Sequence, residues 1–190
     1  MRKLVLAAVL VLVAGGAQAV TLDVIGGQLM GASNVLVDGS FYDVQFLDGT
    51  CIERYNGCDD VSDFTFQTQA SAVLASQALL DQVFLDGVEG QFDSDPGLTR
   101  GCGGYRCRTH TPFIVVGWGS TFIAAEALND FFEYIDVVAL PPSYLANTDF
   151  ANSQSLNFAV WSPTIIPEPS TALLLGLGLT GLAAKGRRRS

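Results

Sequence analysis

An uncharged apolar run stands near each end of this chain, and these two runs decide which residues are free to form a folded domain. The first covers residues 4–15 behind Arg2 and Lys3, and the second covers residues 171–184. Runs of about a dozen apolar residues are shorter than the roughly 20 residues of a typical membrane-spanning helix, and they are typical of targeting segments. We therefore expect one domain between them, over residues 20–163.

Residues 1–19 have the three parts of a secretory signal peptide. A positively charged start precedes the apolar run, and Ala17 and Ala19 then supply the small-x-small pattern that signal peptidase cuts. The alternative is a buried N-terminal helix, which explains neither the charged start nor the alanine pattern. We predict cleavage after Ala19 by signal peptidase and export across the inner membrane.

Residues 164–190 are interpreted as a second targeting segment. A Pro-Glu-Pro motif precedes the run 171–184, and four basic residues follow it; these are Pro167, Glu168 and Pro169, then Lys185, Arg187, Arg188 and Arg189. A helix over the run rises about 21 Å at roughly 1.5 Å per residue, less than the ~30 Å hydrocarbon core of a bilayer, so we expect a temporary transmembrane anchor. The basic end should stay in the cytoplasm, which places the domain on the opposite side of the membrane.

This C-terminal arrangement resembles the PEP-CTERM sorting signal. The resemblance implies that Pro167, Glu168 and Pro169 are recognised by exosortase, a membrane-embedded cysteine transpeptidase that cuts at the motif and releases or transfers the protein. It also implies a Gram-negative producer of exopolysaccharide, and a destination at the cell surface or in the extracellular matrix of a biofilm. The alternative is a generic single-pass anchor that contains Pro-Glu-Pro by chance.

The domain between the two ends is strongly acidic. Six of the ten Lys and Arg residues lie in the terminal segments, which leaves Arg54, Arg100, Arg106 and Arg108 against eighteen carboxylates. A net charge of about −14 repels nucleic acid and anionic lipid, so we expect no nucleic-acid partner. The charge favours solubility and is compatible with divalent cations or basic partners.

Four cysteines, Cys51, Cys58, Cys102 and Cys107, lie in the domain that we expect to be exported, where disulfides are stable. Four cysteines allow three connectivities, and turn residues inside each local loop favour Cys51 with Cys58 and Cys102 with Cys107. The spacings are not those of zinc ligands, and His110 is the single histidine. We predict two disulfides, no metal and no cofactor.

The patterning predicts an α+β fold, with a mostly antiparallel sheet and one packed helix. Asp38-Gly39 is the preferred two-residue turn for a hairpin between residues 34–37 and 41–47. The alanine-rich segment from Thr68 to Leu85 predicts the helix, and Gly87 is expected to end it.

Further strands are expected over residues 112–116 and 156–161, where β-branched or aromatic side chains gather. Residues 119–140 are ambiguous, because their pattern also fits a helix. The aromatic and β-branched second half favours a hairpin that turns at Asn129-Asp130.

The catalytic groups of the domain are few, and we expect a non-catalytic protein. It has no lysine, no G-x-S-x-G nucleophile elbow and no phosphate loop, and its histidine is expected to be exposed and structural. An enzyme that uses paired carboxylates on matrix polysaccharide is the alternative, because that chemistry needs two Asp or Glu residues. A calcium-dependent adhesion module is a third hypothesis, since Asp93 and Asp95 have the spacing of calcium ligands, although the full calcium loop is absent.

Overall fold

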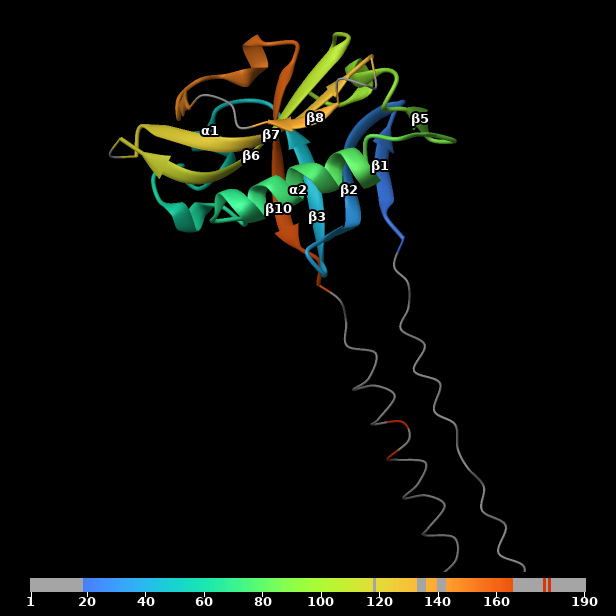
Figure 1. Ribbon diagram of the computed structural model, residues 1–190, viewed down its shortest axis with the longest axis horizontal. Coiled ribbons are helices and arrows are strands. Elements are labelled where there is room, and N and C mark those ends of the chain that lie inside the picture. The colour runs from blue at the N-terminus through green and yellow to red at the C-terminus, as the bar shows by residue number, and fades with distance from the viewer. Residues whose placement is uncertain are drawn as a thin grey trace, which may run out of the picture.

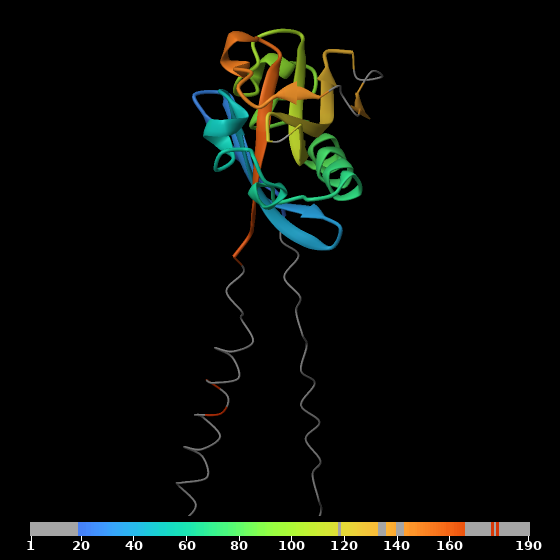
Figure 2. The ribbon, with the colours of Figure 1, turned by 90° about the vertical axis from the view of Figure 1, so that its left-hand side faces the viewer.

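A computed structural model describes residues 19–117, 119–132, 136–139 and 143–165, together with Gly176 and Gly178. The described residues form an eight-stranded sheet with a long helix against one face (Figure 1; Figure 2). Its elements are β1 (Thr21–Ile25), β2 (Gln28–Val37), β3 (Ser40–Leu47), α1 (Cys51–Arg54), η1 (Val61–Asp63), α2 (Gln69–Gln82), β4 (Asp86–Gly87), β5 (Gly90–Gln91), η2 (Pro96–Leu98), β6 (Arg106–Val116), β7 (Thr121–Asp130), β8 (Val137–Ala139), β9 (Tyr144–Leu145), η4 (Phe150–Asn152) and β10 (Leu156–Pro163).

The sheet has the strand order β1-β2-β3-β10-β6-β7-β8, and β9 also pairs with β7. All pairings are antiparallel except that of β10 with β6, which is parallel. The predicted mostly antiparallel sheet with a packed helix is therefore confirmed. Within the described part of the chain, no helix has both the length and the apolar character needed to cross a membrane.

The predicted hairpin is present as β2 and β3. Val37 pairs with Ser40, so Asp38 and Gly39 form a two-residue turn. Both turn residues have positive φ, 48° and 80°, which is the conformation that Asp-Gly adopts in a tight hairpin turn.

Helix α2 begins where the sequence predicts and ends earlier. The Thr68 side chain caps its start by accepting a hydrogen bond from Ser71 N. The backbone N–H groups of Val83 and Phe84 both donate to Leu79 O, which closes the last turn. The predicted end at Gly87 is wrong, because the buried side chains of Val83 and Phe84 turn the chain into the core before that glycine is reached.

The segment left ambiguous is a pair of strands, but its turn is not at Asn129-Asp130. Both residues belong to β7 and are fully buried. The Asn129 side chain donates to Phe92 O at 2.7 Å, and Asp130 pairs with Arg106. These contacts with distant segments hold the two polar residues inside a strand, where turn propensity alone would not place them.

A hydrophobic core lies on each face of the sheet. On the face covered by α2, the rings of Phe46 and Phe84 stack with their centroids 5.4 Å apart. On the opposite face Phe122, Phe150 and Phe158 form an aromatic cluster. Each fully buried Phe contributes about 2–3 kcal/mol, so the sheet is stabilised from both sides.

The strand directions give the domain two distinct ends. The start of β1 at Thr21, the Asp38-Gly39 turn and the end of β10 at Pro163 lie at one end, which we call the basal end (Figure 1). Because β6 is parallel to β10, with Arg108 opposite Leu156, the start of β6 and the end of β7 lie at the other end, the apical end. About 23 Å of strand separates Leu156 from Pro163 at roughly 3.3 Å per residue.

Candidate functional site

Tyr105 stands at the apical end on a short loop that a disulfide closes. Cys102 and Cys107 are bonded, with their Cα atoms 5.6 Å apart, and Cys51 and Cys58 are bonded at the same Cα separation. Both predicted disulfides are confirmed. The second disulfide joins the loop to the start of β6, so the position of Tyr105 depends on it.

Backbone hydrogen bonds fix the same loop to two neighbouring segments. Gly103 N donates to Gln154 O at 2.9 Å, and Phe131 N donates to Tyr105 O at 2.8 Å. Tyr105 is nevertheless 69% exposed. A large aromatic side chain held outward by a rigid loop is suited to contact a ligand.

Tyr105 lines two adjacent hollows of about 440 and 620 Å³. The smaller one is lined by polar and cationic residues of the loop, β6 and the segment before β10, and the larger one extends towards η2 and Phe131. We call this surface the Tyr105 cleft; its lining residues are Gln91, Ser94, Asp95, Gly97, Leu98, Gly103, Gly104, Tyr105, Arg106, Arg108, Phe131, Gln154 and Ser155.

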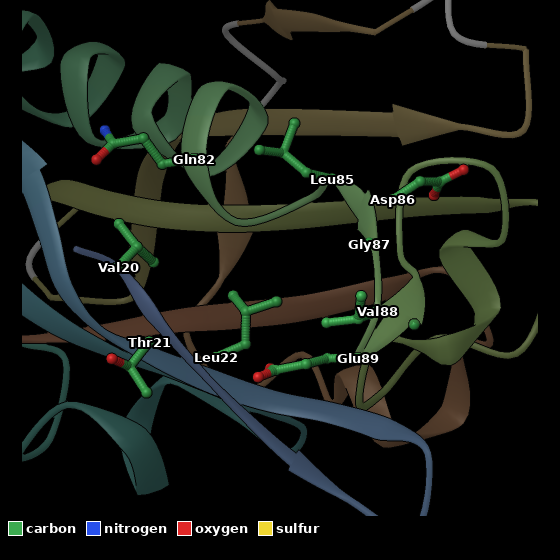
Figure 3. A pocket seen from close by; sticks show the side chains of 10 residues that line it. Val20, Thr21, Leu22, Gln82, Leu85, Asp86, Gly87, Val88 and Glu89 are labelled. Atoms are coloured by element: carbon green, nitrogen blue, oxygen red, sulfur yellow. The ribbon is translucent and has the colours of Figure 1, made fainter.

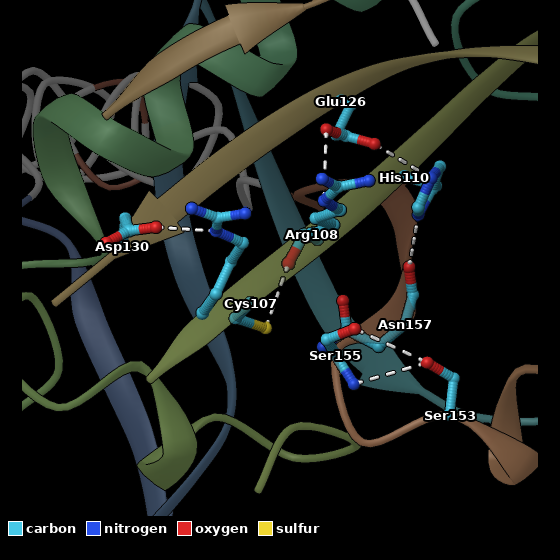
Figure 4. Close-up of polar contacts among 10 residues, drawn as sticks. Cys107, Arg108, His110, Glu126, Asp130, Ser153, Ser155 and Asn157 are labelled. Atoms are coloured by element: carbon cyan, nitrogen blue, oxygen red, sulfur yellow. Dashed lines mark hydrogen bonds and ion pairs between the residues drawn. The ribbon is translucent and has the colours of Figure 1, made fainter. Parts of the chain in front are cut away.

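Two arginines of β6 reach the cleft, each beside a carboxylate of β7 (Figure 4). Arg106 Nε lies 2.5 Å from Asp130 Oδ2, and Arg108 Nε lies 3.8 Å from Glu126 Oε1. The two arginine side chains are 35% and 39% exposed, whereas those of Asp130 and Glu126 are 0% and 6% exposed. The hydrogen bond to Asp130 raises the pKa of Arg106. The guanidinium groups therefore face solvent, with the carboxylates buried behind them.

His110 lies deeper along β6 and is fully buried, so the expectation of an exposed histidine is wrong. Strand alternation turns it to the same face as the two arginines, where its ring contacts Tyr144 and Phe150. Its Nδ1 lies 3.2 Å from Asn157 O, and its Nε2 lies 3.3 Å from Glu126 Oε2 without hydrogen-bond alignment. Burial, and next the charge of Glu126, raises the pKa of Tyr144.

Asp136 and Asp93 form a group of carboxylates with Asp130. Asp136 Oδ1 accepts a hydrogen bond from Asp130 N at 2.7 Å. Burial raises the pKa of Asp136 from 3.8 to about 6; the hydrogen bond from Asp130 lowers it, and the Asp93 carboxyl raises it. Among the residues that the structure describes, His, Cys, Asp and Glu side chains form no group of three that would hold a metal ion.

A separate hollow of about 360 Å³ lies between the start of β1 and the end of α2 (Figure 3). Its apolar lining includes Leu22, Leu85 and Val88, and its charged lining residues are Asp86 and Glu89. The Asp86 carboxylate already accepts hydrogen bonds from Ser94 and Asp93. This hollow therefore offers a ligand fewer free polar groups than the Tyr105 cleft.

Most of the predicted targeting residues lie outside the described residues. This holds for Ala17, for the motif Pro167, Glu168 and Pro169, and for the basic residues Lys185, Arg187, Arg188 and Arg189. It also holds for the expected tail helix 171–184, apart from Gly176 and Gly178. Ala19 is described, and it is exposed just before β1.

Of the residues that line the Tyr105 cleft, the sequence singles out Asp95 alone, through the spacing of calcium ligands that it shares with Asp93. The segment Gly103-Gly104-Tyr105-Arg106 is predicted to turn the chain between two cysteines, and the disulfide confirms this. One signal was present in the sequence, because two of the four arginines of an acidic domain flank Cys107. Gln154 comes from a distant segment, and no local pattern relates it to Tyr105.

The comparisons with known proteins bear on the end of the chain. Residues 166–189 match the family described as PEP-CTERM protein-sorting motif. No curated protein and no solved structure matches the chain.

This match defines the class of the protein. The motif implies export and a membrane-anchored C-terminal sorting signal. The signal is a PEP-CTERM motif, as the sequence predicted, and it implies processing by exosortase.

Proposed function

We propose that this protein is a non-catalytic component of the cell surface or extracellular matrix, whose exported domain binds exopolysaccharide at the Tyr105 cleft. The observation that carries the proposal is the exposed Tyr105 ring, held on a disulfide-closed loop beside two arginines. The producer's polysaccharide is the natural ligand class for a protein that exosortase delivers, since the sorting signal is associated with bacteria that make exopolysaccharide.

The chemistry of the cleft suits a sugar chain. An aromatic face packs against the apolar C–H face of a pyranose ring, and polar groups around it bond the hydroxyls. Here Tyr105 supplies the aromatic face, while Gln154, Ser155 and Arg108 supply amide, hydroxyl and guanidinium groups. The loop is fixed before binding, so little conformational entropy would be lost when a ligand binds.

Support for a non-catalytic role comes from the burial of the groups that general acid–base chemistry would need. His110, Glu126 and Asp130 are buried, and both carboxylates lie beside arginines. A glycosidase needs two carboxyl groups that reach the scissile bond from opposite sides. Glu126 and Asp130 lie behind guanidinium groups and would not reach a sugar in the cleft, and among the described residues that line the cleft Asp95 is the only carboxylate.

The direction of the strands supports display of the cleft away from the point of attachment. The chain leaves the basal end after β10, where Thr164 N donates to Phe41 O at 3.0 Å and Thr164 Oγ1 donates to Asp43 Oδ1 at 2.8 Å. The sorting motif begins three residues later at Pro167. A protein held through this end would present the apical cleft outward.

The test is affinity electrophoresis of the full chain, exported and purified in neutral detergent, through gels that contain the producer's exopolysaccharide. We expect wild-type protein to be retarded and Tyr105→Ala to migrate as in a plain gel. Val88→Ala is the matched control, because Val88 is an exposed side chain of the separate hollow. No retardation of the wild type would contradict the proposal.

Two further readouts separate the alternatives. Reducing sugar ends that accumulate with the wild type would favour a carboxylate enzyme, and we expect none. Retardation that disappears when a calcium chelator is added would favour a calcium-dependent adhesion module, and we expect the retardation to persist.

A further inference from the structure

The distribution of positive charge over the exported domain is uneven. The domain has four arginines and no lysine against eighteen carboxylates, yet Arg106 and Arg108 line the same hollow beside Tyr105. Arg106 also lies over the Tyr105 ring, with its Cζ 5.9 Å from the ring centroid. Half of the domain's cationic groups are therefore gathered at the candidate ligand site.

Both guanidinium groups retain free donors. A guanidinium has five N–H donors, and Arg106 uses its Nε for Asp130. Arg108 Nε is 3.8 Å from Glu126 Oε1, beyond hydrogen-bond distance. Across the described ranges, the terminal Nη groups of neither arginine form a hydrogen bond within the protein. They are available to a ligand.

We infer that the Tyr105 cleft selects acidic polysaccharide, with a uronic-acid carboxylate held by Arg106 and Arg108 and its sugar ring against Tyr105. This inference rests on the proposed function and names its ligand class. The planar, forked guanidinium matches a carboxylate with two parallel hydrogen bonds, which makes Arg suited to this recognition. Gln154 and Ser155 then lie within the same hollow to bond the hydroxyls of the sugar.

The surrounding acidity limits where a polyanion can bind. A net charge of about −14 repels a polyuronate over most of the surface, and the repulsion is screened over roughly 8–10 Å at moderate salt. The carboxylates nearest the arginines, Glu126 and Asp130, are buried and partly neutralised by them. Within the exported domain, contact is therefore favoured at the cleft and disfavoured elsewhere, which predicts one binding site on each domain.

The experiment compares two polysaccharides before and after chemical reduction of their carboxyl groups. The full chain in neutral detergent is titrated with the producer's exopolysaccharide and with polygalacturonate, each in native and carboxyl-reduced form. We expect carboxyl reduction to weaken binding about tenfold or more, the effect of losing a charge-assisted hydrogen bond. We also expect added salt to weaken binding of the native forms.

Variants locate the site. Arg108→Gln and Tyr105→Ala should each weaken binding of the native forms about tenfold, whereas Arg54→Gln removes the same charge outside the cleft and should leave it unchanged. Arg108→Lys keeps the charge but not the fork, so its affinity should fall between wild type and Arg108→Gln. Thermal unfolding of every variant confirms that the fold is retained.

The outcomes separate this inference from the proposed function. Equal binding of the native and carboxyl-reduced exopolysaccharide would overturn the acidic ligand class and leave polysaccharide binding intact. If neither the native nor the carboxyl-reduced exopolysaccharide binds, both the inference and the proposed function are overturned. Equal weakening by Arg54→Gln and Arg108→Gln would show general charge attraction and would also overturn the inference.

Discussion

The disulfide between Cys102 and Cys107 should be required for ligand binding beyond its effect on stability. Replacing both cysteines by alanine opens the loop that carries Tyr105. Replacing Cys51 and Cys58 by alanine opens the other loop, which is not part of the cleft. The second double variant is therefore a matched control for the first.

The expected losses of stability are similar for the two variants. The loops span 5 and 7 residues of sequence separation, and chain entropy gives about 2 kcal/mol for closing a loop of either size. For a domain of this size, that loss lowers Tm by roughly 4–8 °C. The difference should appear in affinity, because fixing two freed residues around Tyr105 costs about 2 kcal/mol, or roughly a thirtyfold weaker complex.

Differential scanning calorimetry and titration with the producer's exopolysaccharide measure the two effects on the same samples. We expect equal falls in Tm, with affinity lost in the Cys102/Cys107 variant and kept in the Cys51/Cys58 variant. Unchanged affinity in both variants would show that the hydrogen bonds of the loop suffice without the disulfide. Equal affinity losses in both would show that binding follows global stability, and would refute the reasoning.

Three further predictions concern stability. The pKa of Asp136 is raised from 3.8 to about 6, so the contribution of this group to stability should fall as the pH rises from about 4 to 6. Asp136→Asn should remove that fall and raise the free energy of unfolding at pH 7 by about 1 kcal/mol after solvent screening. Urea unfolding at several pH values measures both effects. Gly31→Ala should destabilise by more than about 3 kcal/mol in urea unfolding, because the new Cβ would lie 2.2 Å from Val44 O. Tyr55→Phe removes the buried hydrogen bond to Ala159 O and should lower the free energy of unfolding by about 1–2 kcal/mol, with wild-type ligand affinity retained.

The parts of the fold that depend on neighbours in sequence were predictable. Asp38 and Gly39 form the hairpin turn because it requires positive φ at both positions, which Asp-Gly adopts readily. The two disulfides join cysteines whose intervening residues turn the chain back on itself. Thr68 caps a helix whose composition already favours it. In each case the interactions that decide the structure join residues no more than seven positions apart in the sequence.

The parts that depend on distant contacts were not predictable. Asn129 and Asp130 have the propensity of turn residues, but Phe92 and Arg106 bind them within a strand. Its position after a cysteine loop predicts an exposed His110, yet the ring is buried against Tyr144 and Phe150, and its Nδ1 lies 3.2 Å from Asn157 O. Local propensity is a weak term once a buried polar side chain has a partner across the sheet.

The Tyr105 cleft was not predictable for the same reason, because it is formed by segments that are distant in the sequence. Strand β10 is the element that joins the cleft to the basal end. The start of β10 lies beside Arg108 at the apical end, and the segment before it supplies Gln154 and Ser155 to the cleft. The end of β10 pairs with β3 at the basal end, and Thr164 N donates a hydrogen bond to Phe41 O. In the sequence, the sorting motif begins three residues after Thr164. One strand therefore runs from the cleft to the basal end, and about 23 Å of it separates Leu156 from Pro163.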